Sequence, residues 1–117
     1  MTRVANLLCL LVVACTSPFE PDGAVPLDPP DWYALEYHDV EQCTGLNFPY
    51  DLVEWWTVLG KYVVDENGVK WSGLWSSGTN SITIASEKTY SRWLVRHESI
   101  HLLTRSVNHT GKAWACE

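Results

Sequence analysis

The sequence has few basic residues, no long apolar run and no internal repeat. Its 8 Lys and Arg residues stand against 14 Asp and Glu residues, which gives a formal net charge of −6. No segment gathers the positive charge that nucleic acids attract, so we expect no nucleic-acid partner. The longest mainly apolar run, residues 4–13 with Asn6 as its one polar residue, is too short for a membrane-spanning helix, which needs about 20 residues. The 117 residues have room for one small domain.

The start of the chain has the pattern of an export signal. Arg3 supplies a positive charge before the short apolar run. The run ends in Val12-Val13-Ala14-Cys15, which resembles a bacterial lipobox, where the cysteine receives a lipid. The alternative is an ordinary secretory signal in which Cys15 has no role. We predict a lipoprotein signal peptide over residues 1–14, lipidation of Cys15, and an exported protein anchored by lipid to a membrane of the bacterial cell envelope.

Residues 15–30 have the composition of a disordered tether. They contain five of the six prolines together with several acidic residues, and such a segment buries too little apolar surface to offset its ordering entropy. We therefore place the folded domain at residues 31–117. A domain of this size has a marginal core and often needs a disulfide or a metal ion.

The four cysteines divide according to this organisation. Cys9 leaves with the signal peptide and Cys15 carries the lipid, so Cys43 and Cys116 remain in the domain. Because disulfides persist in exported proteins, we predict that these two form a bridge. Such a bridge closes a long loop and is worth about 4 kcal/mol in the chain-entropy model. The alternative is a pair of free, buried thiols.

The spacing of apolar and turn-forming residues predicts a domain of the α+β class. Helices are expected at residues 31–42 and 88–105, and strand segments at 53–59, 61–64, 69–74 and 81–85. Asn67-Gly68 is a strong hairpin turn because both residues readily adopt positive φ angles. We expect a small antiparallel or mixed sheet of three to four strands, with an N-terminal helix and an active-site helix.

Four residues mark the expected helix ends. Asp31 is a good N-cap for the first helix, and Gly45 is a good stop for it. Ser86 or Thr89 could cap the second helix.

The chain is rich in tryptophan. Its seven tryptophans are Trp32, Trp55, Trp56, Trp71, Trp75, Trp93 and Trp114. A small domain uses such large side chains to build its core, so we expect core positions for most of them. Trp75 and Trp114 lie next to turns and are the expected exceptions. A sugar-binding platform is the alternative, but it leaves the histidines described next without a role.

The segment His97-Glu98-Ser99-Ile100-His101 lies on the second predicted helix. Residues four apart lie one turn apart on the same face, so His97 and His101 can reach one metal ion. Glu98 lies beside that position and could act as a general base toward a water whose pKa a zinc ion lowers. Chance alone produces this pattern in about one such sequence in a hundred. Two unrelated helix histidines are therefore the alternative.

A catalytic zinc site takes three protein ligands and leaves one position open. His109 is the only later histidine, and a turn after the helix could bring it back to the ion. Cys116 and Glu117 are the other candidates, although Cys116 is better placed in the disulfide. We predict one zinc ion held by His97, His101 and His109. We also predict that strand 81–85 is an edge strand beside the site.

These residues carry a resemblance to known families. The five-residue segment resembles the signature of the zincins, and a third histidine downstream resembles the metzincin group. Three features depart from the metzincins: the third histidine comes eight residues after His101 instead of six, Thr104 replaces a glycine, and no methionine follows.

The chain more closely resembles small uncharacterised bacterial lipoproteins with a lipobox, a helix ending in Val-Glu-x-Cys-x-Gly, and Val-Arg-His-Glu-x-x-His before a later His and Cys. The matching segments here are residues 40–45, 95–101, His109 and Cys116. The resemblance implies a zinc peptidase with an unassigned substrate. We therefore expect a monomeric zinc metallopeptidase, with Glu98 as its general base, that acts on a peptide or protein. The alternative is an envelope lipoprotein that binds zinc without catalysis.

Overall fold

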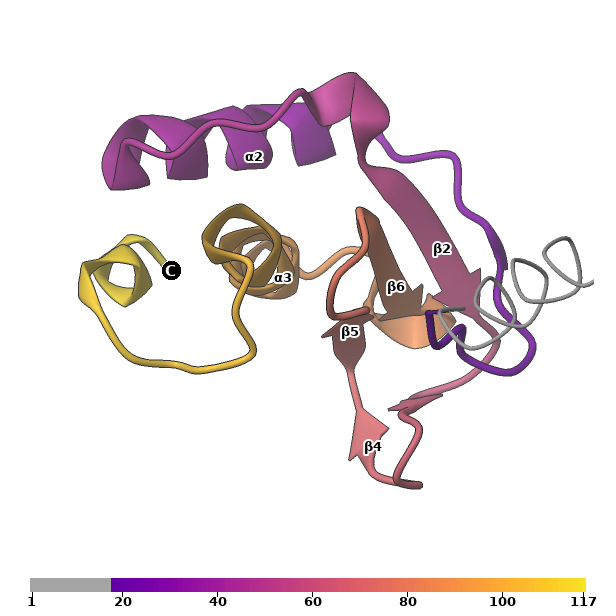
Figure 1. Cartoon of the computed structure of the whole chain (residues 1–117). Helices are drawn as coiled ribbons and strands as arrows, with labels where there is room; N and C mark the ends of the chain where they lie inside the picture. Colours follow the sequence, from indigo (N-terminus) through magenta and orange to yellow (C-terminus); the bar gives the residue numbers. More distant parts are fainter. Residues whose placement is uncertain (1–17) are drawn as a thin grey trace, which may run out of the picture.

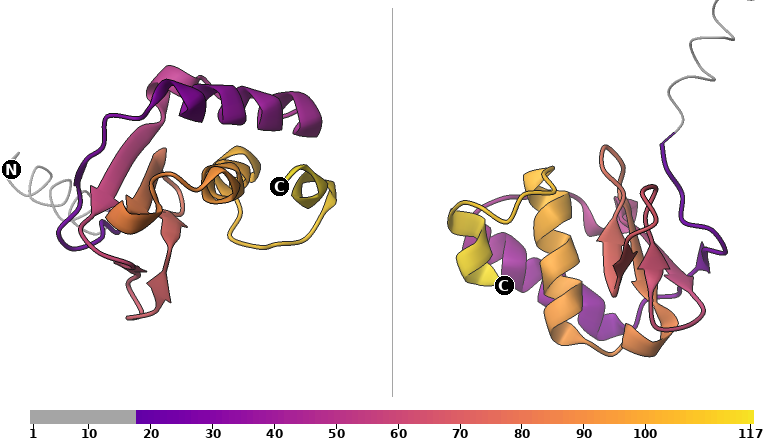
Figure 2. Two further views of the ribbon diagram at one scale, coloured as in Figure 1. Left: turned by 180° about the vertical axis from the view of Figure 1, so that it is seen from behind. Right: turned by 90° about the horizontal axis from the view of Figure 1, so that it is seen from below.

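The computed structural model describes residues 18–117 and shows an α+β domain (Figure 1). The predicted signal peptide and Cys15 lie outside the described residues. Two helices, α2 (Asp31–Thr44) and α3 (Arg92–Thr104), pack against each other and against a mixed sheet of four strands. The right-hand view of Figure 2 shows α3 between the sheet and the short helix η3 (Lys112–Cys116). Among the described residues, no helix has the length and apolar composition of a membrane span.

The four-stranded sheet has the order β1-β2-β6-β5. Strands β2 (Glu54–Val58) and β6 (Ser81–Ala85) are parallel neighbours, whereas β5 (Gly73–Trp75) runs antiparallel to β6. Strand β6 therefore lies inside the sheet, which corrects our prediction that residues 81–85 form an edge strand. All residues of β6 after Ser81 are buried, as expected for a strand that is covered on both faces. Strand β5 is the edge strand on the side of α3.

Strand β1 (Val25–Pro26) lies within the segment for which we predicted no fixed structure. It pairs antiparallel with β2, and the Leu27 N–H donates to the Trp55 carbonyl at 2.9 Å. The prediction of disorder is wrong for these residues. A proline fits this position because an edge strand can lack one N–H donor.

A two-stranded hairpin extends from the sheet away from the helices (Figure 1). It consists of β3 (Val63–Val64) and β4 (Lys70–Trp71). Its turn lies at the predicted position, but only Gly68, at φ 79°, has the positive φ that we expected of both Asn67 and Gly68. The single strand predicted at 69–74 is in fact two strands. Residue 72 separates β4, which pairs with β3, from β5, which pairs with β6.

Helix α2 presents one apolar face to the core. Tyr33, Tyr37 and Val40 are fully buried, as their i, i+4, i+7 spacing indicates. The helix runs two residues beyond the predicted end and stops at Gly45, whose φ of 74° and N–H bond to the Glu41 carbonyl form the expected C-cap. Pro30 occupies the N-cap position, so Asp31 is the first helical residue instead of the cap.

Helix α3 begins four residues later than predicted. Residues Ser86–Lys88 form a separate 3-10 turn, η2, and the Ser91 side chain accepts the Leu94 N–H at 3.2 Å. Ser91 is therefore the N-cap, in place of Ser86 or Thr89. Arg105 ends the helix in the left-handed conformation, with φ 54°.

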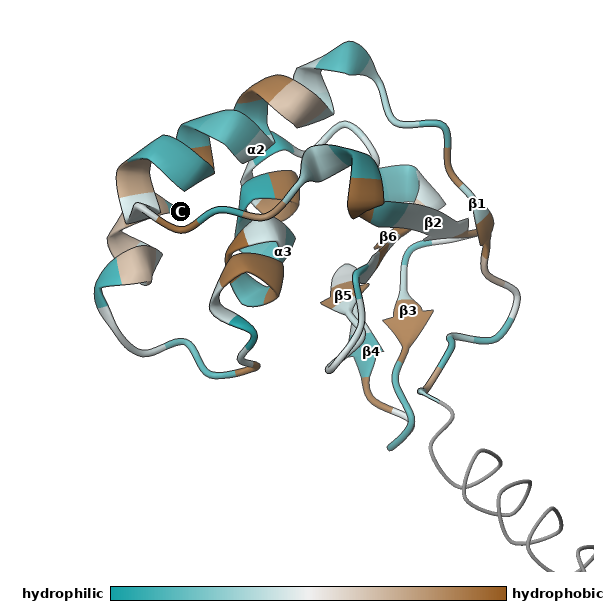
Figure 3. Cartoon of the chain, turned by 45° about the horizontal axis from the view of Figure 1, so that its top comes forward, coloured by the Kyte–Doolittle hydropathy of each residue, from teal (hydrophilic) through white to brown (hydrophobic). Residues whose placement is uncertain are grey.

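The core lies where α2 and α3 face the sheet. Both helices carry apolar and polar residues side by side along their length (Figure 3). Trp55 and Trp75 are buried in this core, so the prediction that Trp75 lies outside it is wrong. Trp114 packs against the core while partly exposed, and Trp71 and Trp93 are about half exposed. The predicted disulfide between Cys43 and Cys116 is confirmed, with Cα atoms 5.8 Å apart. It joins the end of α2 to η3.

Candidate metal centre

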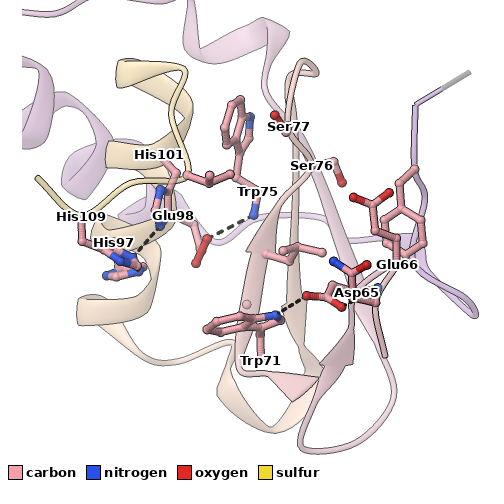
Figure 4. Close-up of a pocket in the computed structure, with 15 residues that line it drawn as sticks. Asp65, Glu66, Trp71, Trp75, Ser76, Ser77, His97, Glu98, His101 and His109 are labelled. Carbon is pink, nitrogen blue, oxygen red and sulfur yellow. Dashed lines mark hydrogen bonds between the residues drawn. The ribbon is translucent and has the colours of Figure 1, made fainter. Parts of the chain in front are cut away.

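Three histidines converge on one point beside α3. His97 and His101 project from successive turns of the helix, and His109 comes from the loop that follows it (Figure 4). The Nε2 atom of His109 lies 3.3 Å from Nε2 of His97 and 3.1 Å from Nε2 of His101. The sequence predicted this group of three. Cys116 and Glu117, the other candidates for the third position, are used elsewhere.

The spacing of these nitrogen atoms fits a tetrahedral metal site. Two nitrogen ligands bound at about 2.05 Å with a tetrahedral angle between them lie about 3.3 Å apart. The separations of 3.1 and 3.3 Å between Nε2 of His109 and those of His101 and His97 are close to this value. Three imidazole acceptors held this close repel one another unless a proton or a cation lies between them. The arrangement could therefore hold one metal ion.

Two of the three imidazoles are oriented through their other ring nitrogen. Nδ1 of His97 lies 2.6 Å from a carboxylate oxygen of Glu117, and Nδ1 of His101 lies 2.8 Å from the Ser106 carbonyl. An acceptor at Nδ1 favours the tautomer whose Nε2 lone pair is free to bind a metal. Sequence reasoning missed both partners, because neither has a recognisable spacing from its histidine.

Burial also keeps His101 in the form that binds metals. Its side chain is buried, and this burial lowers its pKa, although the hydrogen bond to Ser106 acts in the opposite direction. The neighbouring His97 and His109 lower this pKa further. A neutral imidazole is the ligand form, so His101 is prepared to bind a metal ion at neutral pH.

Glu98 lies beside the three histidines and is almost completely buried, with 4% of its surface exposed. One of its carboxylate oxygens accepts the backbone N–H of Trp75 in β5 at 3.1 Å (Figure 4). Burial raises the pKa of Glu98 to about 8, and the hydrogen bond from Trp75 opposes this shift. The carboxyl group is thus held by the edge strand, a contact that the sequence does not reveal.

Gly73 allows α3 to approach β5 this closely. A Cβ atom at this position would lie 3.1 Å from Cδ1 of Leu94 and 3.3 Å from Cγ of Glu98. Both distances are tighter than ordinary van der Waals contacts. A side chain at residue 73 would therefore require Leu94 and Glu98 to shift by a few tenths of an ångström.

A cleft of about 410 Å³ opens on the histidines and Glu98. It runs between α3 and the loop after it on one side, and β4, β5 and the β3–β4 turn on the other (Figure 4). Trp71 and Glu66 line the wall opposite the histidines. The three imidazoles therefore face a space that a ligand can enter. The fourth histidine, His38, lies on α2 and bonds Glu41 at 2.7 Å, away from this cleft.

Comparisons of this chain with protein-family models, curated protein sequences and solved structures find no match.

Proposed function

We propose that this protein is a zinc-dependent peptidase whose centre is formed by His97, His101, His109 and Glu98. The observation that carries the proposal is the convergence of three imidazoles beside a buried carboxylate in an open cleft. A structural zinc site is usually closed by four protein ligands and needs no base. Three ligands, an open side and an adjacent carboxylate are the components of a hydrolytic centre.

The three imidazoles would hold the ion. Three imidazole nitrogen donors, with His109 at near-tetrahedral spacing from each of the other two, suit zinc better than magnesium or calcium, which prefer oxygen ligands. A bound zinc ion would act as a Lewis acid toward a peptide carbonyl and would lower the pKa of a nearby water. The protein's own contribution is to hold the ligands in place before the ion arrives.

Glu98 would move the proton. The hydrogen bond from Trp75 fixes one carboxylate oxygen, and within residues 18–117 no hydrogen bond occupies the other. The charge of a bound zinc ion would lower the raised pKa of Glu98, so this oxygen could take a proton from a water in the cleft and later deliver it to the amine nitrogen of the cleaved bond. A carboxylate attached to a strand edge keeps one orientation during both transfers.

The position of β5 suits an extended peptide substrate. It is an edge strand of the sheet, it lines the cleft, and α3 with the histidines packs beside it. An extended chain in the cleft would run beside β5 and place a carbonyl near the histidine cluster. We therefore propose a peptide or protein as the substrate.

The test replaces Glu98 by Gln in the full chain. The amide keeps the size of the side chain but cannot take a proton, so we expect one equivalent of zinc to bind and peptide cleavage to fall by about 100-fold to 10,000-fold. Cleavage of a mixed peptide library, followed by mass spectrometry, measures the loss. Glu66→Gln in the same cleft is the control and should stay active. Equal cleavage by Glu98→Gln and the parent protein would contradict the assignment.

A further inference from the structure

Helix η3 places an indole ring against all three histidines. The ring centroid of Trp114 lies 4.9 Å from that of His97, 4.8 Å from that of His101 and 4.8 Å from that of His109. Trp114 is absent from the residues that line the cleft. It therefore packs on the imidazoles without facing the space that a substrate would enter.

Trp114 is also bonded to the loop that carries the third histidine. Its Nε1–H donates to the Asn108 carbonyl at 3.1 Å, directly before His109 in the chain. That loop has no helix or strand of its own, and the His109 side chain is exposed. Of the three imidazoles, the one on the loop depends most on contacts from another segment.

The position of η3 is set by α2 and α3. The disulfide joins Cys116 to Cys43 at the end of α2. Arg96 on α3 donates to the Cys116 carbonyl and also to Asp39 on α2. Arg96 directly precedes His97, and Cys116 closely follows Trp114. These bonds therefore fix the two segments that bring the Trp114 ring against the His97 ring.

We propose that Trp114 is a positioning residue for the metal centre, and that the Cys43–Cys116 bridge holds it in place. Ordering a side chain on an irregular loop costs conformational entropy, and every contact made before the ion binds reduces that cost. The inference rests on the metal binding in the proposed function but does not depend on peptide cleavage. Partners of metal ligands usually change metal affinity by 10-fold to 100-fold, and we expect the same range here.

The experiment measures zinc affinity by competition with a chromophoric chelator. Trp114→Ala should weaken zinc binding by about 10-fold or more, and Trp114→Phe should recover part of it because the ring contact remains. Trp71→Ala removes a tryptophan on the far wall of the cleft and is the matched control, with affinity unchanged. The visible absorption of bound Co²⁺ should change in Trp114→Ala and not in the control.

A double-mutant cycle shows whether Trp114 acts through His109. Once His109 is replaced by Ala, Trp114→Ala should cost less affinity than it does in the parent, because the group that it orients is gone. Equal losses in both backgrounds, or parent-like affinity in Trp114→Ala, would overturn the proposal. If Trp114→Ala does not fold, zinc affinity is measured in Trp114→Phe and in the double variant Cys43→Ser/Cys116→Ser. Parent-like affinity in both of these variants would overturn the proposal.

The two proposals fail in different ways. A parent protein that binds zinc but cleaves no peptide would end the proposed peptidase and leave the role of Trp114 intact. A parent protein that cleaves peptides but whose zinc affinity is unchanged by Trp114→Ala would end the role of Trp114 and leave the proposed peptidase intact. A parent protein that binds no zinc would overturn both.

Discussion

His101 and His109 each offer an imidazole nitrogen to the candidate metal centre, but their surroundings differ. His101 is buried on a helix, and its Nδ1 atom bonds a backbone carbonyl five residues later. His109 is exposed on a loop, and its support is the Trp114 ring in a segment that a disulfide attaches to α2. Local structure therefore places and orients His101, whereas the placement of His109 depends on a segment that the disulfide fixes.

The largest effect is expected from removing the buried ligand. His101→Ala should weaken zinc binding by at least about 1,000-fold, because it removes a preoriented ligand and leaves the half-buried Ser106 carbonyl without its partner. Isothermal titration with zinc measures the change. His38→Ala on α2 is the control and should bind zinc like the parent. Binding within tenfold of the parent would mean that the helix pair does not form the site.

A smaller effect is expected from the loop ligand. His109→Ala should weaken zinc binding by about 100-fold, because His97 and His101 still form a two-nitrogen site and the lost side chain had to be ordered at an entropic cost. The same titration compares the two variants. If His109→Ala binds zinc like the parent, the third ligand is another residue, and the loop after α3 does not contribute to the site.

The smallest effect concerns the ion pairs that hold α3 against α2. Burial alone would raise the pKa of Glu36, but hydrogen bonds from Arg96 and Arg92 outweigh it and lower the pKa below its ordinary value near 4.5. The stabilisation is therefore complete above about pH 4.5 and is lost as the pH falls through the lowered pKa. Glu36→Gln should reduce the free energy of unfolding by about 2 kcal/mol at pH 7.

Urea unfolding at several pH values tests this prediction in the metal-free protein. The difference between the parent and Glu36→Gln should shrink as the pH falls below 4.5, because the parent carboxylate then becomes protonated. Glu20→Gln, in the segment before β1, is the control. A difference that stays constant down to pH 3 would show that the ion pairs do not contribute through the charge of Glu36.

Much of the fold could be predicted from local patterns. The apolar spacing of α2, the Asn67-Gly68 turn and the bounds of β6 are short-range properties, and the structure has all three. The place of β6 inside the sheet could not be predicted in this way. It depends on which strands lie on either side, and a run of five residues carries little information about its neighbours.

The start of α3 shows the same limit at a smaller scale. Ser86, Thr89 and Ser91 are all suitable caps by residue type, so composition does not select among them. The choice of Ser91 follows from tertiary contacts, because Ser86 instead bonds the Gly60 N–H at 2.8 Å and the Tyr33 hydroxyl donates to the Thr89 carbonyl at 2.6 Å.

The sequence by itself determined that His97 and His101 share one helix face with Glu98 beside them, because helical periodicity requires it. It also favoured His109 and the Cys43–Cys116 pair, since few alternatives remain in so short a chain. Only the tertiary structure decided what supports them: the Trp75 N–H on Glu98, Glu117 on His97, and Trp114 across all three rings. These contacts join segments far apart along the chain or made of irregular backbone, and no periodicity connects such segments.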